Sequence, residues 1–221
     1  MYDGPRSPIT QTFGLGLFEV PTAADMDKLE QFFTSRQAHV MHEVSPMADK
    51  SLLAILNARQ YRPYELTSVM CQPLAGRRPS PRTVIRVRLA GNADGDVWAR
   101  TAAEGWRELT EFADQIHDLM HVSAATEDCY RFMAELDGQP IATGALAIHG
   151  GVALLAGAST IPEWRNRGAQ RALLDARLDY AATAGCDLAM MGAEPGSASQ
   201  RNAQRHGFQI AYTRIKWALN A

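Results

Sequence analysis

The chain has 221 residues, which is enough for one large domain or two small ones. Hydrophobic residues make up 46% and charged residues 21% of it, both ordinary values for a globular protein. The formal net charge of −2 argues against a general binder of nucleic acid or of an anionic membrane, because such proteins usually carry a net basic face. A local basic pocket is still compatible with this composition.

The three cysteines, Cys71, Cys129 and Cys186, are scattered through the sequence in apolar or strand-like surroundings. An odd, dispersed set of this kind predicts buried free thiols in a reducing compartment. The sequence shows no N-terminal signal pattern, and no apolar run approaches the roughly 18 residues that a membrane span requires. We therefore expect a soluble, cytoplasmic protein.

The first third of the chain predicts helices alternating with strands. Thr22 is a plausible N-cap for a helix with apolar residues at helical spacing, and residues 40–44, 49–59 and 64–71 predict a strand, a helix and a second strand. Residues 74–82 contain two prolines, one glycine, one serine and three arginines, a composition typical of a linker. We therefore expect one domain at 1–75, a linker at 76–82 and a second domain at 83–221.

The second part of the chain predicts an α/β (α+β) domain. A strand at 83–89 and one or two helices within 94–120 precede a three-strand meander at 130–136, 141–148 and 152–160, whose first turn is Asp137-Gly138. A helix at 169–184, a strand at 186–193, a short helix at 197–205 and a closing strand at 210–219 follow. The strand, helix and strand between 152 and 193 predict a parallel crossover unit.

Residues 161–171 carry the strongest indication of function, because a basic, glycine-bearing turn leads there from a strand into a helix. Arg165, Arg167 and Arg171 surround Gly168 in this segment. The first N–H groups of a helix have no internal partner, and the helix dipole favours negative charge at that end. Such a turn is suited to a pyrophosphate. An ordinary turn with a solvated basic surface is the alternative that the spacing leaves open.

In the segments Arg165-Asn-Arg-Gly-Ala-Gln170 and Asn202-Ala-Gln-Arg-His-Gly-Phe208 the chain resembles the GNAT superfamily of acyl-CoA-dependent N-acyltransferases. The family turn is Gln/Arg-x-x-Gly-x-Gly/Ala, so that Arg165 and Gly168 fit it and Gln170 departs from it. The resemblance covers roughly residues 82–221. It implies a mixed, mostly antiparallel sheet with a splayed pair of parallel strands.

The first 75 residues repeat the element order of the second half of that fold, which suggests a degenerate, partial second copy. They lack an arginine-rich glycine turn, so we do not expect them to bind cofactor. An unrelated small α/β cap is the alternative.

The resemblance also implies where acetyl-CoA binds. The pyrophosphate is expected on the backbone N–H groups of residues 167–171, and the pantetheine arm beside residues 159–161, where it pairs as an added strand does. A backbone N–H near Thr160 or Ile161 would serve the thioester oxygen. The amide of Asn202 is a further candidate contact, unless this residue is simply a surface asparagine. The candidate cofactor-binding residues are Ser159, Thr160, Ile161, Arg165, Asn166, Arg167, Gly168, Ala169, Gln170, Arg171 and Asn202.

Catalytic residues are less clearly indicated. A tyrosine is the frequent general acid of the family, and Ala203 stands at its position. Glu194 is a candidate to accept the amine proton, although a solvated loop carboxylate is the alternative, and Tyr212 is a candidate to protonate the leaving thiolate. Glu135 is a further possible base. His117 and His121 lie one helical turn apart without an evident third ligand, so no metal is expected.

From the resemblance we expect an N-acetyltransferase that moves the acetyl group of acetyl-CoA to a primary amine by direct attack. The acceptor is a small molecule or a peptide, and no nucleic-acid or membrane partner is expected. The protein would be a monomer or a homodimer. A non-catalytic module that binds acyl-CoA or a partner is the alternative function.

Overall fold

The computed structural model describes residues 1–81, 83–108 and 129–219. The fold has two compact units, Cys71–Met191 and the combination of Met1–Met70 with Gly192–Ala221. The predicted division into 1–75 and 83–221 remains a prediction. Among the helices of the described residues, none has both the length and the apolar character needed to cross a membrane.

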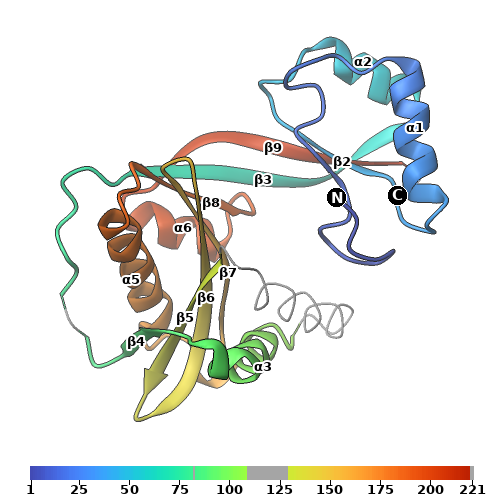
Figure 1. Cartoon of the computed structure of the whole chain (residues 1–221). Coiled ribbons are helices and arrows are strands. Elements are labelled where there is room, and N and C mark those ends of the chain that lie inside the picture. The colour runs from blue at the N-terminus through green and yellow to red at the C-terminus, as the bar shows by residue number, and fades with distance from the viewer. Residues whose placement is uncertain (82, 109–128, 220–221) are drawn as a thin grey trace. The chain divides into compact units, whose positions relative to one another are not determined.

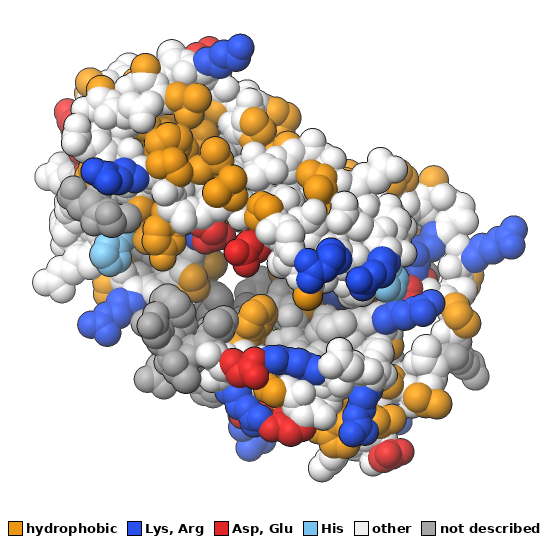
Figure 2. All heavy atoms as spheres, turned by 180° about the vertical axis from the view of Figure 1, so that it is seen from behind, with side chains coloured by type: hydrophobic (Ala, Val, Ile, Leu, Met, Phe, Trp, Pro, Cys, Tyr) orange, Lys and Arg blue, Asp and Glu red, His pale blue; other side chains and the backbone are white. Residues whose placement is uncertain are grey.

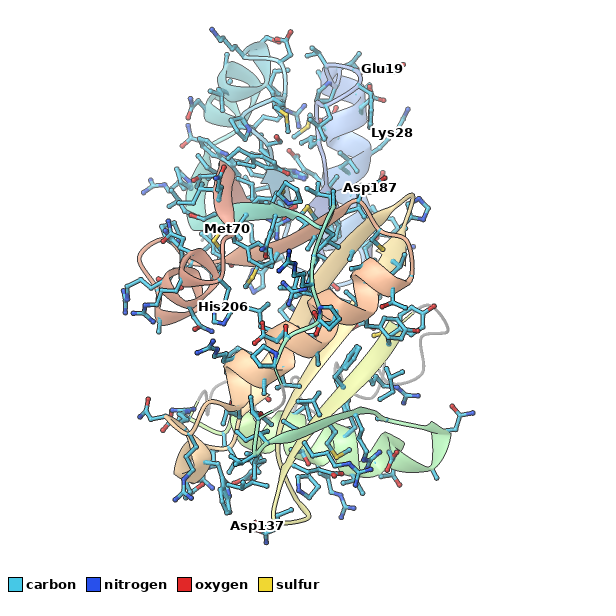
Figure 3. The ribbon with its side chains drawn as sticks, turned by 90° about the vertical axis from the view of Figure 1, so that its left-hand side faces the viewer. Glu19, Lys28, Met70, Asp137, Asp187 and His206 are labelled. Atoms are coloured by element: carbon cyan, nitrogen blue, oxygen red, sulfur yellow. The ribbon has the colours of Figure 1, made fainter. Side chains whose placement is uncertain are left out.

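The unit Cys71–Met191 contains a mixed, mostly antiparallel sheet, as predicted. Strands β4 (Arg86–Leu89), β5 (Cys129–Leu136), β6 (Gln139–His149) and β7 (Val152–Thr160) pair antiparallel in sequence order, and β7 pairs parallel with β8 (Leu188–Ala193). The predicted turn between β5 and β6 is confirmed, since Asp137 and Gly138 have φ angles of 52° and 78°. Asp137 lies at the tip of this hairpin (Figure 3).

Helices α3 (Gly95–Gly105) and α5 (Ala169–Thr183) cover opposite faces of this sheet (Figure 1). Helix α3 follows a short 3₁₀ turn, η1 (Asn92–Asp94), and its fully buried Trp98 donates from Nε1 to the Phe132 carbonyl at 3.0 Å. This bond satisfies the indole N–H inside the core. The rest of the helical region predicted within 94–120 lies from residue 109 onward outside the described residues.

Helix α5 ends where the sequence predicts. Gly185 has a φ of 81°, and the N–H groups of Gly185 and Cys186 donate to the carbonyls of Ala182 and Ala181. These are the two hydrogen bonds of a Schellman motif, which closes a helix with a left-handed glycine. The segment predicted as a linker lies against the same helix, because Arg77 Nε donates to Asp179 at 2.7 Å.

The other unit contains β1 (Thr12–Phe13), α1 (Ala23–Thr34), β2 (Met41–Val44), α2 (Ser51–Ala58), β3 (Tyr61–Pro73), α6 (Ala198–Arg205) and β9 (Gln209–Leu219). Its strands follow the order β1, β2, β9, β3. Thr22 caps α1 as predicted, in a capping box with Asp25. Trp217 of β9 joins the core formed by α1 and α2, with Phe33 and Leu52 among its members.

The cysteines are free, but only one of them is fully buried. Cys186 is buried, whereas Cys71 and Cys129 are half-buried. The expectation of three buried thiols is therefore wrong for two of them. Burial raises the pKa of all three thiols, which keeps them protonated and poorly nucleophilic at neutral pH.

Candidate functional site

Strand β7 carries a bulge near its end. Thr143 of β6 is the partner of Ser159, while Ala145 is the partner of Ala156, so two residues of β7 stand opposite Gly144 alone. One of the two is Gly157, whose φ is 57°. A left-handed glycine in this position is typical of a bulge that bends its strand and increases the local twist.

The parallel pair β7–β8 separates just before this bulge. Pairing begins at Val152 with Leu188 and ends at Leu155 with Met191, among the residues that the structure describes. Strand β7 continues to Thr160, so its last five residues, 156–160, have no pairing with β8. The predicted splayed pair of parallel strands is thus confirmed, and it leaves one edge of the end of β7 without pairing to β8.

Two backbone N–H groups at this end were candidates to polarise a thioester, and the structure separates them. The Ile161 N–H donates to the Ile141 carbonyl at 3.0 Å and is therefore engaged within the sheet. Ala142 and Thr160 form the neighbouring pair of the ladder. Since bonded and non-bonded pairs alternate along antiparallel strands, the Thr160 N–H points away from β6. Thr160 is the candidate that remains.

After β7 the chain passes through a 3₁₀ turn, η3 (Pro162–Trp164), into the start of α5. Asn166 and Gly168 have φ angles of 62° and 88°. The first helical bond runs from the Ala172 N–H to the Gly168 carbonyl, so the N–H groups of residues 168–171 have no partner within the helix. A Cβ built on Gly168 meets no atom within 4 Å, which shows that the space beside this glycine is open.

The three arginines of the turn have different environments. Arg165 donates to Glu108 at 2.6 Å and to the Gly105 carbonyl at 3.3 Å, so that its side chain fastens the turn to the end of α3. Arg167 stacks over the ring of Trp164, with its Cζ 4.9 Å from the ring centre. Arg171 is 69% exposed and lies 3.9 Å from Asp175. Within the part of the chain that the structure describes, Arg167 has no ion pair and Arg171 has only the long one to Asp175, so these two guanidinium groups are the candidates to meet an anion.

A cavity of ≈ 280 Å³ opens beside these two arginines. It is lined by Pro81, Thr83, Val84, Ile85, Arg167, Gly168, Arg171 and Asp175. Figure 2 shows basic and acidic side chains interspersed over one face of the protein, rather than a field of one sign. Within the cavity lining, the charged side chains are Arg167, Arg171 and Asp175.

Gln170, the residue that departs from the family pattern, has a structural partner. Its Nε2 donates to the Thr160 hydroxyl at 2.8 Å and ties the first turn of α5 to the end of β7. On the other face, the Ser159 hydroxyl donates to the Ala102 carbonyl of α3 at 3.0 Å. A Cβ on Gly105 would lie 2.4 Å from that hydroxyl oxygen, so α3 packs directly on β7 there. Because the Ser159 hydroxyl is already used, only the Ser159 backbone is left for the predicted contact with the cofactor.

A larger cavity of ≈ 440 Å³ lies on the α3 side of the same turn. It is lined by Val97, Arg100, Thr101, Glu104, Gln139, Pro140, Ile161 and Trp164. Arg107 forms ion pairs with both Glu104 and Glu163 at its edge. Segment 161–168 thus borders both cavities, with Ile161 and Trp164 facing one, and Arg167 and Gly168 the other.

Four predicted positions belong to the other unit, and their place relative to the turn remains a prediction. Glu194 is exposed, Tyr212 of β9 is half-buried, and the methyl group of Ala203 is 1% exposed. Asn202 of α6 is half-buried, and its carbonyl is 2.9 Å from His206 Nδ1. The exposure of Glu194 fits a solvated carboxylate as well as a base.

Two further sequence-based candidates are Glu135 and the pair His117 and His121. Glu135 accepts a hydrogen bond from Arg88 Nε at 2.7 Å, an ion pair within the sheet that occupies this carboxylate. His117 and His121 lie outside the described residues.

The sequence reasoning missed the residues that shape the bulge. Gly144 and Gly157 interrupt otherwise apolar strands, a signal that commonly marks a bulge or a close backbone approach. Arg177 stands four residues after Leu173 on the buried side of α5 and is only 4% exposed. A charged residue within an apolar helical stripe is the signal that could have revealed it.

Residues 96–208 match the sequence model of the acetyltransferase (GNAT) family. This is more than half of the 221 residues, and the chain therefore belongs to this family. The resemblance inferred from the turn is confirmed. The family and the fold support acyl transfer as the general class of chemistry.

Known structures agree on the fold. A GCN5-related N-acetyltransferase from Kribbella flavida is 18% identical, with a TM-score of 0.70 over 93% of this chain and 77% of that one. The GCN5-related N-acetyltransferase from Sphaerobacter thermophilus is 18% identical, with a TM-score of 0.65 over 88% of this chain and 66% of that one. A tandem GNAT protein from the clavulanic acid biosynthesis pathway is 15% identical, with a TM-score of 0.62 over 88% of this chain and 68% of that one. No protein of curated function matches in sequence.

Proposed function

We propose that the protein is an N-acetyltransferase that moves the acetyl group of acetyl-CoA to a primary amine by direct attack. The observation that carries the proposal is the open start of α5, where the N–H groups of residues 168–171 have no partner within the helix. Two arginines lie beside these groups: Arg167, which stacks on Trp164, and the exposed Arg171. Acetyl-CoA would supply both the diphosphate that such a site accepts and the acetyl thioester.

The residues at the turn fit a diphosphate. Helix N–H groups and the helix dipole both favour anions at this end. Arg167 and Arg171 add charge, and the cavity that they line is next to Gly168, whose missing side chain leaves room for a phosphate to approach. Asp175 is the one carboxylate in the lining, and its oxygens lie 3.4 Å from Arg77 and 3.9 Å from Arg171.

The end of β7 fits the arm between the diphosphate and the thioester. Residues 156–160 have an unpaired side, and an extended amide-bearing chain can pair with such a strand edge. The Thr160 N–H is turned to this side and would polarise the thioester carbonyl. Gln170 holds the Thr160 hydroxyl and so fixes the distance between the two parts of the site.

Proton transfer is the least constrained part of the proposal. Direct attack requires a neutral amine and a route for the proton that it loses. Glu194 is our candidate base and Tyr212 our candidate acid, and Asn202 remains a candidate contact to the pantetheine. The roles of Glu194, Tyr212 and Asn202 are thus part of the proposal.

The acceptor is proposed to bind in the larger cavity on the α3 side. This cavity borders Ile161, one residue after the proposed carbonyl-polarising Thr160. Its lining mixes apolar side chains with Glu104, Gln139 and Arg100, which suits a polar small molecule or a peptide amine. A cytoplasmic location is proposed from the free thiols, and a monomer or homodimer is expected.

One observation favours the alternative of a non-catalytic acyl-CoA-binding module. Ala203 fills the position of the usual acid, and its methyl group is buried. Amine-dependent release of free CoA thiol across a broad panel of amines would exclude this alternative. Acetyl-CoA binding without any such release would favour it.

Calorimetry with acetyl-CoA tests the binding site. Replacing both Arg167 and Arg171 with Gln should weaken binding roughly 100-fold, because each lost charge-assisted contact is worth about 1.5 kcal/mol or more. Arg131→Gln is the matched control, since Arg131 lies on β5, lines neither cavity and is separated from β7 by β6. Unchanged affinity in the double variant would contradict the proposal.

A further inference from the structure

Helix α5 buries one charged side chain, Arg177. It is 4% exposed and lies between the buried residues Leu173, Leu174 and Leu178. No carboxylate of the described residues is within ion-pair distance of it. Burial lowers the pKa of Arg177 to about 10, so the guanidinium is still charged at neutral pH.

Backbone carbonyls take the place of a carboxylate partner. Arg177 Nε donates to the Leu173 carbonyl at 3.1 Å, one turn back in the helix. Its Nη1 donates to the Ala145 carbonyl of β6 at 3.2 Å and to the Ala156 carbonyl of β7 at 3.4 Å. Ala145 and Ala156 are the last regular pair before the bulge. The guanidinium therefore bridges β6 and β7 at the point where their ladder is interrupted.

Gly144 makes this position possible. A Cβ built on Gly144 would lie 3.0 Å from Arg177 Cζ and 3.1 Å from Nη1, closer than side chains normally approach. Gly144 is also the single residue of β6 that faces Gly157 and Ala158 across the bulge. The guanidinium thus lies flat on the β6 backbone directly over the bulge.

We propose that Arg177 is a positioning residue, which holds the Ala145 and Ala156 carbonyls and so sets where the backbone of residues 157–160 stands for acyl-CoA. The inference rests on the proposed function. A buried charge without a carboxylate partner is costly for stability, and a leucine or methionine would fill the same space more favourably. What the arginine adds is a set of N–H donors at an interrupted ladder, which supply hydrogen bonds that strand pairing no longer provides.

The direct test is Arg177→Met, which keeps an apolar stem and removes the donors. Calorimetry compares acetyl-CoA with ADP, because ADP carries a diphosphate but no pantetheine or thioester. We expect acetyl-CoA binding to weaken at least about tenfold while ADP binding changes less than about twofold, since the turn at residues 168–171 is not altered. A loss of stability alone would weaken the binding of both ligands equally, or would leave both affinities unchanged.

Two further variants separate positioning from packing. Leu178→Ala removes a buried side chain of α5 but keeps the Arg177 donors, so it should lower Tm and leave the ratio of the two affinities unchanged. Gly144→Ala keeps Arg177 but displaces its guanidinium, and should reproduce the effect of Arg177→Met even if that variant fails to fold. Arg177→Lys retains the charge and one donor group, and should restore part of the ratio.

Amide hydrogen exchange without ligand distinguishes failure of this inference from failure of the proposed function. In Arg177→Met, and in Gly144→Ala, exchange at those amides of residues 156–160 that donate to β6 should accelerate at least about tenfold beyond the change at other β7 amides. If the wild-type protein binds no acetyl-CoA, the proposed function fails while this measurement still decides the role of Arg177. Unchanged local exchange together with an unchanged affinity ratio in both variants would overturn the inference.

Discussion

The two units each contain a strand that leads through a turn into a helix, and the two turns end differently. In the first, Asp49 precedes α2 and its carboxylate accepts from the Ser51 N–H at 2.8 Å. The Asp49 N–H itself donates to the Gly16 carbonyl. In the second, the N–H groups of residues 168–171 are left without a partner in their helix, and arginines stand where the first turn has an acid.

The difference separates a structural turn from a candidate site. A helix start that is capped by its own chain has already used the donors that an anion would need. A helix start that stays open, with a glycine in front of it and cations beside it, retains them for a ligand. The presence of a strand–turn–helix therefore says little about binding, and the fate of its first N–H groups says much more.

The largest effect should come from giving the turn before α5 the acidic residue that stands before α2. Arg167→Asp places a carboxylate at the position that corresponds to Asp49, where it can cap α5 and repel a phosphate. We expect acetyl-CoA affinity to fall about 1,000-fold, or about 4 kcal/mol, as measured by calorimetry. Arg167→Gln, which removes the charge without adding a cap, is the control and should lose only about tenfold. Equal losses in both variants would show that self-capping is irrelevant.

The unit that contains residues 1–70 buries a histidine, and the pH dependence of its stability should reveal this. His42 is fully buried against Tyr61, with Nε2 3.0 Å from the hydroxyl, and burial lowers the pKa of His42 to about 4. The unfolded chain takes up a proton near pH 6.5, before the folded chain does. Stability should therefore be complete above pH 6.5 and fall as the pH drops toward 4, by up to about 3 kcal/mol.

Denaturant unfolding between pH 4 and 7 checks this expectation. His42→Gln should flatten the pH dependence in that window, because glutamine does not titrate. A wild-type protein whose stability is constant over the same window would contradict the assignment of a neutral, buried His42.

A smaller effect, on the free energy of unfolding, is expected from the backbone of the turn before α5. Gly168→Ala places a side chain at a φ of 88°, which costs about 1 kcal/mol for a residue other than glycine. The added methyl group meets no atom, so the expected loss in the free energy of unfolding comes from backbone strain alone. Chemical denaturation measures it, and Gly185→Ala at the other end of α5, where φ is 81° and the space is also open, is the matched control.

The smallest effect should come from removing the acidic residue of the turn before α2. Asp49→Ala removes the exposed carboxylate that accepts from the Ser51 N–H just before α2, so it should reduce Tm slightly. Acetyl-CoA affinity should change less than about twofold, because no arginine accompanies the freed N–H groups. A new anion site in this variant, detected by calorimetry with ADP, would show that arginines are not needed.

The features of this structure that could be predicted from the sequence are those that depend on a few neighbouring residues. The capping box at Thr22, the turn at Asp137-Gly138 and the glycine end of α5 at Gly185 each depend on a few neighbouring residues, and all were found where the sequence placed them. The basic turn at residues 161–171 and the family were also predictable, because the motif lies between a strand and a helix in sequence.

Features that depend on distant parts of the chain could not be foreseen. The pairing of Met41 with Ala218 joins residues at opposite ends of the sequence. The bond from Gln170 to Thr160 and the packing of Arg177 on Gly144 depend on how a helix settles on a sheet. The ion pairs of Arg165 with Glu108 and of Glu135 with Arg88 also join residues far apart in the sequence.

The central claim is that the open helix start of α5 holds the diphosphate of acyl-CoA. The most direct measurement is a titration of ¹⁵N-labelled protein with acetyl-CoA, followed by amide chemical shifts. The account predicts saturable shifts of the amides of residues 168–171, with those of residues 49–53 unchanged. Saturable binding that leaves the amides of residues 168–171 unmoved would contradict it.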